Sequence, residues 1–233
     1  VEAPAPAIPL LSRCEYIDYV YPKDSLNKPV CDYEYMLMNL PLLCHTTYQT
    51  IPYDNPYITA DPLLIKQWQD KIPSNNFTVG ICWHSKDEKL EPDPYRNRDI
   101  PLTAFSHIAS IENTTLISLQ KGTGCAQLNT VPFTVMSFNI DEEHGAFMDT
   151  AAIMNIVNVV ITTDTSIAHL AGALGVPVWV ILPYTADWRW FIKRSDSPWY
   201  PTMRLFRQHQ PGDWDTVMKE VALALKMHTN HGQ

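Results

Sequence analysis

From residue 76 to the end, short apolar runs alternate with amphipathic stretches. The apolar runs have the length and β-branched content of strands, and the stretches between them carry apolar residues at helical spacing. Such alternation predicts a parallel sheet buried on both faces, with right-handed crossovers. The predicted strands are FTVGICW (77–83), TLISL (115–119), FTVMSF (133–138), VVI (159–161) and VWVIL (178–182), and the predicted helices are 101–111, 147–157 and a short helix before Gly175.

The first 60 residues follow a different pattern. They are rich in proline, tyrosine and cysteine, with short extended segments between turns and no long amphipathic helix. Residues 1–60 therefore look like half a domain, and 61–75 like a linker that contains a short helix. Residues 76–210 form the predicted Rossmann-like domain, and 211–228 a terminal amphipathic helix. Since the sequence starts without methionine, we expect it to be a piece of a longer protein.

Composition narrows the functional classes. The chain has 233 residues, a hydrophobic content of 45% and a net charge of −8. An acidic chain offers no general attraction to nucleic acid or anionic membrane, so a phosphate site would have to be local. Five scattered cysteines suggest neither a disulfide framework nor a metal site, which favours a reduced, cytoplasmic setting. No apolar run approaches the length of a transmembrane helix.

The turn between residues 161 and 167 has the polar side chains that are most informative about function. A buried strand runs into Asp164, Thr165 and Ser166, and a helix follows. Free N–H groups and the positive end of the helix dipole make such a turn suited to an anion. Asp164 and Thr165 are equally typical of a simple helix N-cap. His169 lies one turn further along, on the face opposite the apolar stripe, and we interpret it as a surface histidine.

In parallel sheets, ligands bind beyond the carboxyl ends of the strands. Trp83 and the polar loop up to Arg98 follow the first predicted strand, and Gln120 and Lys121 follow the second. Arg98 and Lys121, and with less weight Arg96, could bind phosphate, although each could equally be a solvated surface cation. The sequence contains no GxGxxG, GxxxxGK[ST], GxSxG, HExxH or CxxC motif, so we predict no metal site and no P-loop.

Residues 187–208 are dense in tryptophan and arginine. Their rings could form a stacking wall for a base or sugar, or they could close the edge of the domain against the last helix. We favour packing against the last helix for these rings. Trp188 and Trp190 are the two that could instead stack on a ligand.

Several segments together resemble a known family. VGICW, NRDIPLTAF, SLQKG, DTAAIMNIVNVVITTDTSIAHLAGALGVPVWVILP, DWRW, SPWYPTMRLFRQ and GDW occur in this order. They resemble the C-terminal region of family 9 glycosyltransferase (heptosyltransferase)-like proteins that carry tetratricopeptide repeats upstream, and more distantly the O-linked N-acetylglucosamine transferases. The resemblance implies the α/β GT-B architecture, in which two Rossmann-like domains face each other across a cleft. The C-terminal domain would bind the nucleotide-sugar donor, the partial N-terminal domain the acceptor, and the last helix would cross back to that N-terminal domain.

The resemblance also implies a set of donor-binding residues. These are Trp83, Arg98, Gln120, Lys121, Asp164, Thr165, Ser166 and His169. Two features depart from the family: this chain lacks the glycine-rich EQGLGD-like loop, and Ser166 stands where heptosyltransferases have glycine. No tetratricopeptide repeat is present. The catalytic residues therefore stay unassigned, with the base expected outside this chain.

Two functions follow as expectations. The first is a glycosyltransferase, or a fragment of one, that moves a sugar from a nucleoside-diphosphate sugar to a hydroxyl of a protein or glycan acceptor, without a further cofactor. The second is a degenerate GT-B domain that binds a protein or a nucleotide sugar without catalysis. A sugar-nucleotide epimerase of this fold would need an acid/base constellation that the sequence does not show.

Overall fold

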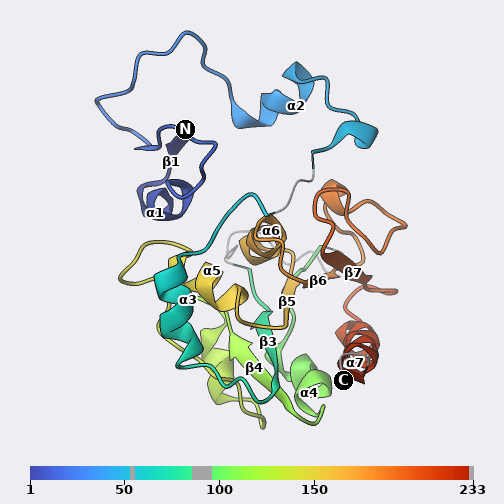
Figure 1. The fold of residues 1–233 in the computed structure, drawn as a ribbon. Helices are drawn as coiled ribbons and strands as arrows, with labels where there is room; N and C mark the ends of the chain where they lie inside the picture. Colours follow the sequence, from blue (N-terminus) through green and yellow to red (C-terminus); the bar gives the residue numbers. More distant parts are fainter. Residues whose placement is uncertain (53–55, 86–95, 231–233) are drawn as a thin grey trace.

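The computed structural model describes residues 1–52, 56–85 and 96–230, and its centre is a five-stranded parallel sheet (Figure 1). The strands are β3 (Phe77–Cys82), β4 (Thr114–Ser118), β5 (Val159–Thr163), β6 (Val178–Leu182) and β7 (Met203–Arg207), and they lie in the order β4-β3-β5-β6-β7. The chain runs outward from β3 to β4, then returns to β5 on the other side of β3. This reversal creates the crevice in which open α/β sheets bind ligands. The predicted α/β class with a parallel sheet is confirmed.

Helices cover both faces of the sheet, because strand side chains alternate between the two faces. One face packs under α3 (Pro62–Gln69), α5 (Met148–Met154) and α6 (Ser166–Ala173). The other packs under η4 (Leu102–Phe105), α4 (Ser106–Ala109) and α7 (Trp214–Asn230). Val79 and Ile81 point to the second face, whereas Val178 and Val180 point to the first. Each fully buried aliphatic side chain contributes about 1.5–3 kcal/mol.

Two strands differ from the prediction. The described segment 133–138 is not a strand, and its bridge to β4 pairs Met136 with Ile117. Conversely, 203–207 is the edge strand β7, although Arg204 and Arg207 interrupt its apolar pattern. An edge strand tolerates such residues because one side meets solvent. The Arg204 guanidinium lies over the Phe206 ring, 4.6 Å from its centroid, and stays exposed.

The two flanking helices are integral to the sheet domain. α3 lies in the predicted linker, but its Trp68 is buried and the helix packs against α5. The resemblance implies that α7 crosses back to the N-terminal region. In the structure α7 packs on α4, η4 and β7, because its apolar stripe of Val217, Val221 and Leu225 is buried against them.

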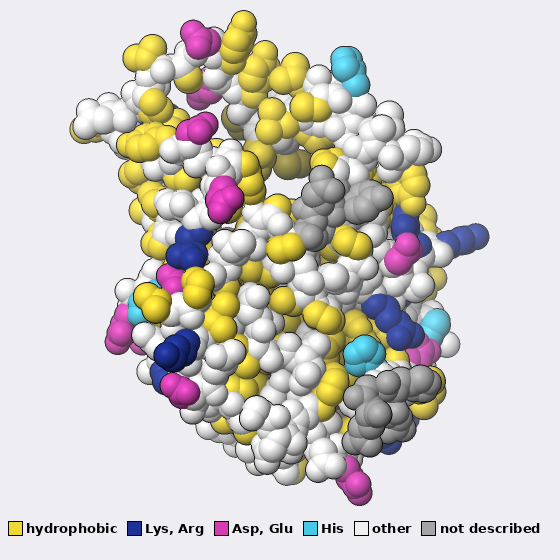
Figure 2. Space-filling view, viewed as in Figure 1, with side chains coloured by type: hydrophobic (Ala, Val, Ile, Leu, Met, Phe, Trp, Pro, Cys, Tyr) yellow, Lys and Arg dark blue, Asp and Glu magenta, His cyan; other side chains and the backbone are white. Residues whose placement is uncertain are grey.

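The N-terminal part consists of short elements and lies beyond α6 (Figure 1). They are β1 (Glu2–Ala3), η1 (Ala5–Ala7), α1 (Ile8–Leu11), β2 (Tyr21–Pro22), η2 (Leu37–Asn39), α2 (Leu40–Leu43) and η3 (Tyr48–Thr50). Tyr57 and Ile58 donate backbone hydrogen bonds to the Ala173 carbonyl, and Arg13 pairs with Asp61 at 3.0 Å. Figure 2 shows hydrophobic side chains gathered on this part. Leu26, Val30, Met36, Leu37, Met38 and Leu42 are exposed.

Candidate functional site

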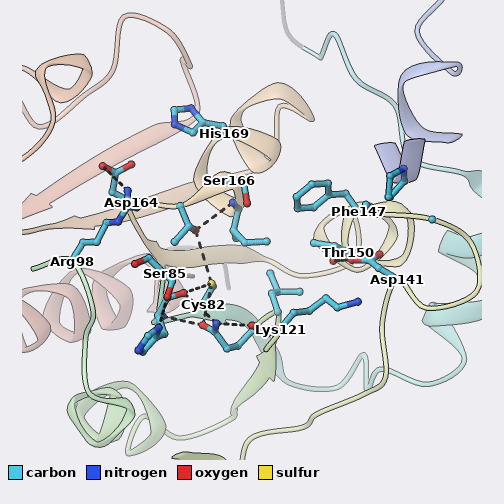
Figure 3. Close-up of a pocket in the computed structure, with 18 of the residues that line it drawn as sticks. Cys82, Ser85, Arg98, Lys121, Asp141, Phe147, Thr150, Asp164, Ser166 and His169 are labelled. Atoms are coloured by element: carbon cyan, nitrogen blue, oxygen red, sulfur yellow. Dashed lines mark hydrogen bonds and ion pairs between the residues drawn. The ribbon is translucent and has the colours of Figure 1, made fainter. Parts of the chain in front are cut away.

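A cleft of about 1600 Å³ opens at the carboxyl edge of the sheet (Figure 3). The exits of β3, β4 and β5 form its floor, and Pro6, Leu37 and Met38 of the N-terminal part line it from another side. The cleft brings together Arg98, Gln120, Lys121, Asp164, Thr165, Ser166 and His169, all of them predicted from the sequence.

The turn between β5 and α6 combines a helix cap with an open anion-binding position. The Thr165 hydroxyl oxygen accepts a hydrogen bond from the Ile167 backbone N–H at 3.3 Å, so Thr165 is the N-cap of α6. The next residue, Ser166, is exposed in the cleft. The capping interpretation is therefore correct for Thr165, while Ser166 remains at the cleft surface.

Arg98 is held at the same turn from two directions. Its guanidinium Nη1 lies 4.0 Å from a carboxylate oxygen of Asp164, which is 5% exposed. Its backbone carbonyl accepts a hydrogen bond from the Thr163 hydroxyl. A cation thus lies beside the N-terminal end of α6, where both would attract the same anion. Most of the polar loop that precedes Arg98, residues 86–95, lies outside the described residues.

Gln120 supports the floor of the cleft. Its Oε1 accepts hydrogen bonds from the backbone N–H groups of Trp83 and His84, at 3.1 and 2.9 Å. Its Nε2 donates to the Thr123 carbonyl at 2.9 Å and to those of His84 and Lys121. The amide therefore ties the exit of β3 to the exit of β4. We interpret Gln120 as a residue that positions the floor.

Trp83 differs from the other predicted site residues. It is fully buried in the apolar cluster under η4 and α4, away from the cleft. The reason is the strand alternation, because Val79, Ile81 and Trp83 point to the same face of the sheet. The structure therefore assigns Trp83 to the core.

Lys121 lies at the opposite side of the floor from Arg98 (Figure 3). Its ammonium donates a hydrogen bond to the Ile140 carbonyl at 2.5 Å, which directs this exposed side chain toward the loop before α5. That loop contributes Asp141 and Glu142 to the cleft. We do not predict these acids as site residues from the sequence, although the run DEEH at 141–144 directly precedes a predicted helix.

Further residues at the exit of β3 line the cleft. His84 and Ser85 follow β3, and the His84 Nε2 lies 3.4 Å from Asp99. The Cys82 thiol, which is 3% exposed, lies 3.3 Å from the Gln120 Oε1. Burial raises the pKa of Cys82 to about 11, so the group is a neutral thiol at pH 7 and a poor nucleophile.

His169 is a partly buried histidine with two aromatic neighbours. Its ring stacks on Trp190, with centroids 5.3 Å apart, and its Nδ1 lies 3.0 Å from the Tyr200 hydroxyl. Burial lowers the pKa of His169, and the Arg189 cation acts in the same direction while Asp164 opposes it. The imidazole is therefore neutral at pH 7. This corrects our expectation of a plain surface histidine.

The lowered pKa of His169 predicts a pH dependence of stability. As the pH falls below the usual histidine pKa of about 6.5, the unfolded chain binds a proton before the folded chain does. We therefore expect the free energy of unfolding to fall as the pH is lowered from 6.5 to the folded-state pKa. In the His169→Gln variant the free energy of unfolding should depend less on pH over this range. Urea unfolding at pH 7.5 and 5.5 measures the difference. A variant with the same slope as the native chain would contradict the prediction.

Comparison with known proteins identifies the fold. No family model matches the chain. ADP-heptose lipopolysaccharide heptosyltransferase II of E. coli superposes with a TM-score of 0.58 at 13% identity, over 98% of this chain and 89% of that one. The glycosyl transferase family 9 structure from Veillonella parvula superposes with a TM-score of 0.53 at 13% identity, over 73% of this chain and 52% of that one. The chain therefore shares the α/β fold of these two structures.

A sequence relative is longer than this chain. Protein FlbA of Caulobacter vibrioides is 25% identical over 187 residues, which make up 77% of this chain and 30% of FlbA. The chain thus spans less than a third of FlbA and about half of the Veillonella structure. Within residues 1–52, 56–85 and 96–230, no helix is long and apolar enough to cross a membrane, and no group of histidine, cysteine or acidic side chains could hold a metal ion.

Proposed function

We propose that this chain is the donor-binding part of a glycosyltransferase that moves a sugar from a nucleoside-diphosphate sugar to a hydroxyl of a protein or glycan acceptor. The observation that carries the proposal is the convergence, in one cleft, of the α6 N-terminus, the exposed Ser166 and the Arg98 guanidinium. The likeness to the heptosyltransferase fold supports it.

The proposed chemistry is displacement of the nucleoside diphosphate from the anomeric carbon. Negative charge grows on the departing diphosphate, and donors that are already aligned with that group stabilise it at no cost of reorganisation. We assign this role to the positive N-terminal end of α6, the Ser166 hydroxyl and Arg98. His169 can add a neutral N–H donor at Nε2 when the Tyr200 hydroxyl donates to Nδ1. The base that deprotonates the acceptor is expected outside this chain.

Substitution of Ser166 tests the donor site directly. A glutamate at this position places a carboxylate at a helix N-terminus, where the dipole favours it, so the fold should be retained. The same carboxylate repels a diphosphate, and we expect Ser166→Glu to weaken ADP or UDP binding by at least about tenfold. The Ser166→Gln variant is the matched control, because glutamine is neutral and nearly equal in size to glutamate. Its affinity for ADP or UDP should fall much less than that of Ser166→Glu.

Isothermal titration with ADP, UDP and their sugars provides the measurement. The proposal predicts that the native chain binds at least one of these nucleotides. No binding at millimolar concentration, or equal losses in the two Ser166 variants, would contradict a diphosphate site at this turn.

A non-catalytic GT-B domain is the second candidate, and Ser166 favours it, because heptosyltransferases have glycine at this place. Consumption of a nucleotide sugar in the presence of acceptors separates the candidates, because such a domain would bind the donor without releasing the nucleotide. From the resemblance we further propose that tetratricopeptide repeats precede this region in the intact protein. The free cysteines support a cytoplasmic setting for it.

A further inference from the structure

A second groove, of about 1440 Å³, adjoins the donor cleft beyond the ends of β6 and β7. Arg98 and Asp164 line both spaces, so this ion pair marks the boundary between them. The remaining wall comes mostly from the loop 183–194, which the donor site leaves largely unused. An occupant of the groove would therefore lie next to the proposed diphosphate without replacing it.

The charge of the groove is opposite to that of the whole molecule. Its basic lining residues are Arg96, Arg98, Lys193, Arg194 and Arg207, and its acidic ones are Asp164 and Asp187. Asp164 lies beside Arg98 and Asp187 lies 3.3 Å from Arg189, while Arg194 is itself paired with Asp196 at 2.7 Å. With these pairs counted, the cations still outnumber the carboxylates. On a chain with a net charge of −8, this excess of cations provides a local attraction for an anion.

Hydrogen-bond donors at the base of the groove point to a polar ligand. Gln208 is 3% exposed, and its Oε1 accepts hydrogen bonds from the backbone N–H groups of Tyr184 and Gly212. Its Nε2 has no partner among the described residues, whereas buried amide donors are ordinarily paired. Arg207 is fixed nearby, because its Nη2 donates to the carbonyls of Trp190 and Phe191, at 3.2 and 2.8 Å.

Aromatic rings give the groove an apolar wall. Trp188 is 65% exposed, Tyr184 48% and Phe191 38%, which is unusual for three rings in one groove. Trp199 supports Trp188 from the side in an edge-on contact, with centroids 6.4 Å apart. Exposed rings pack well against the apolar C–H face of a pyranose, while cations and amide donors bind its acidic group and hydroxyls.

We propose that this groove binds a sugar that bears a carboxylate or a phosphate, as the acidic part of a glycan acceptor. The acceptor role rests on the proposed function, whereas binding of the acidic sugar does not. A glycan fits the groove better than an acidic peptide does, because the exposed rings and the basic groups line the same space.

Saturation-transfer NMR with glucuronate and glucose 6-phosphate tests this proposal, with methyl glucoside as the neutral comparison. We expect at least one acidic sugar to bind about fivefold more tightly than methyl glucoside, and the tighter of the two identifies the acidic group. Lys193→Glu and Trp188→Ala should each weaken that binding by about fivefold. Both side chains are exposed, so these variants should fold. Lys226→Glu is the matched control, because Lys226 is exposed near the other end of α7, where His228 contacts Phe77.

Three results would overturn the proposal. They are equal binding of methyl glucoside, displacement of the acidic sugar by ADP, and displacement of it by a short polyglutamate peptide at lower concentration. The Ser166→Glu variant separates the two sites, since it should lose ADP while it keeps the acidic sugar. Failure of the native chain to bind any nucleotide would therefore reject the donor site and leave the sugar groove standing.

Discussion

Replacement of Gly172 by alanine is expected to lower the free energy of unfolding by about 2–3 kcal/mol. Gly172 lies within α6, directly under the ring of Tyr200. A Cβ at this position would lie 2.4 Å from two carbon atoms of that ring. The ring has little room to retreat, because Tyr200 is buried and also contacts the His169 ring. Alanine is ordinarily favoured over glycine in a helix by about 1 kcal/mol. We expect Gly172→Ala to be destabilising nevertheless, because the contact with the ring costs more than this gain.

Urea unfolding of a double-mutant cycle isolates this contact. In a Tyr200→Ala background, Gly172→Ala should cost much less or even stabilise, because the ring that it meets is gone. The single variant Gly172→Ala, which retains Tyr200, should also bind nucleotide more weakly than the native chain. The new methyl group displaces the Tyr200 ring, so the His169 Nδ1 loses its partner. If Gly172→Ala is as stable as the native chain, the Tyr200 ring is not held as we describe.

The pattern of apolar residues was sufficient to predict the parallel sheet, its helices and the edge at which the cleft opens. It failed where tertiary context overrides local pattern. β7 carries two arginines, so its apolar signal is weak: Arg204 is exposed, and Arg207 donates to the carbonyls of Trp190 and Phe191. The segment 133–138 has a strand-like composition but contacts the sheet mainly at Met136. The periodicity of apolar residues does not predict that 203–207 is a strand or that 133–138 is not. Both results depend on which strand lies at the edge of the sheet.

The same distinction applies to the site. The polar groups at strand exits were predictable, because parallel strands end at a common edge. Trp83 could have been excluded from the sequence, since it continues the alternation of Val79 and Ile81 into the core. The role of Gln120 could not be predicted, because it depends on the spacing of the β3 and β4 exits. His169 depends on a similar long-range contact, since its partner Tyr200 is 31 residues away.

The loop that carries Asp141 and Glu142 into the cleft depends on one buried carboxylate, Asp149. This side chain is 4% exposed. One of its oxygens accepts a hydrogen bond from the Trp68 indole at 2.9 Å, and the other accepts from the Asp141 backbone N–H at 2.8 Å. Helix α3, helix α5 and the cleft loop are thus joined at a single group. Loss of that group should affect both stability and the shape of the cleft.

Asp149→Ala is accordingly expected to lower the free energy of unfolding by about 3–4 kcal/mol, because it leaves the Trp68 indole and the Asp141 N–H buried without an acceptor. In that background, Trp68→Phe should cost less than it does in the native chain, since the orphaned indole donor is removed with the ring nitrogen. Urea unfolding of the four proteins measures this coupling. Additive losses would show that the two residues do not depend on each other.

The charge of Asp149 predicts how this contribution varies with pH. Burial raises the pKa of Asp149, but the hydrogen bonds from Trp68, the Asp141 N–H and His144 outweigh it, so the pKa lies below its ordinary value of 3.8. The stabilisation is therefore complete above pH 3.8 and disappears as the pH falls through the lower folded-state pKa. The Asp149→Asn variant, which keeps the volume but lacks the titrating group, should show a flatter stability profile between pH 5 and 2. An unchanged acid profile would mean that other carboxylates dominate acid unfolding, and that the cleft loop is held mainly by the Asp141–Thr150 hydrogen bonds at the start of α5.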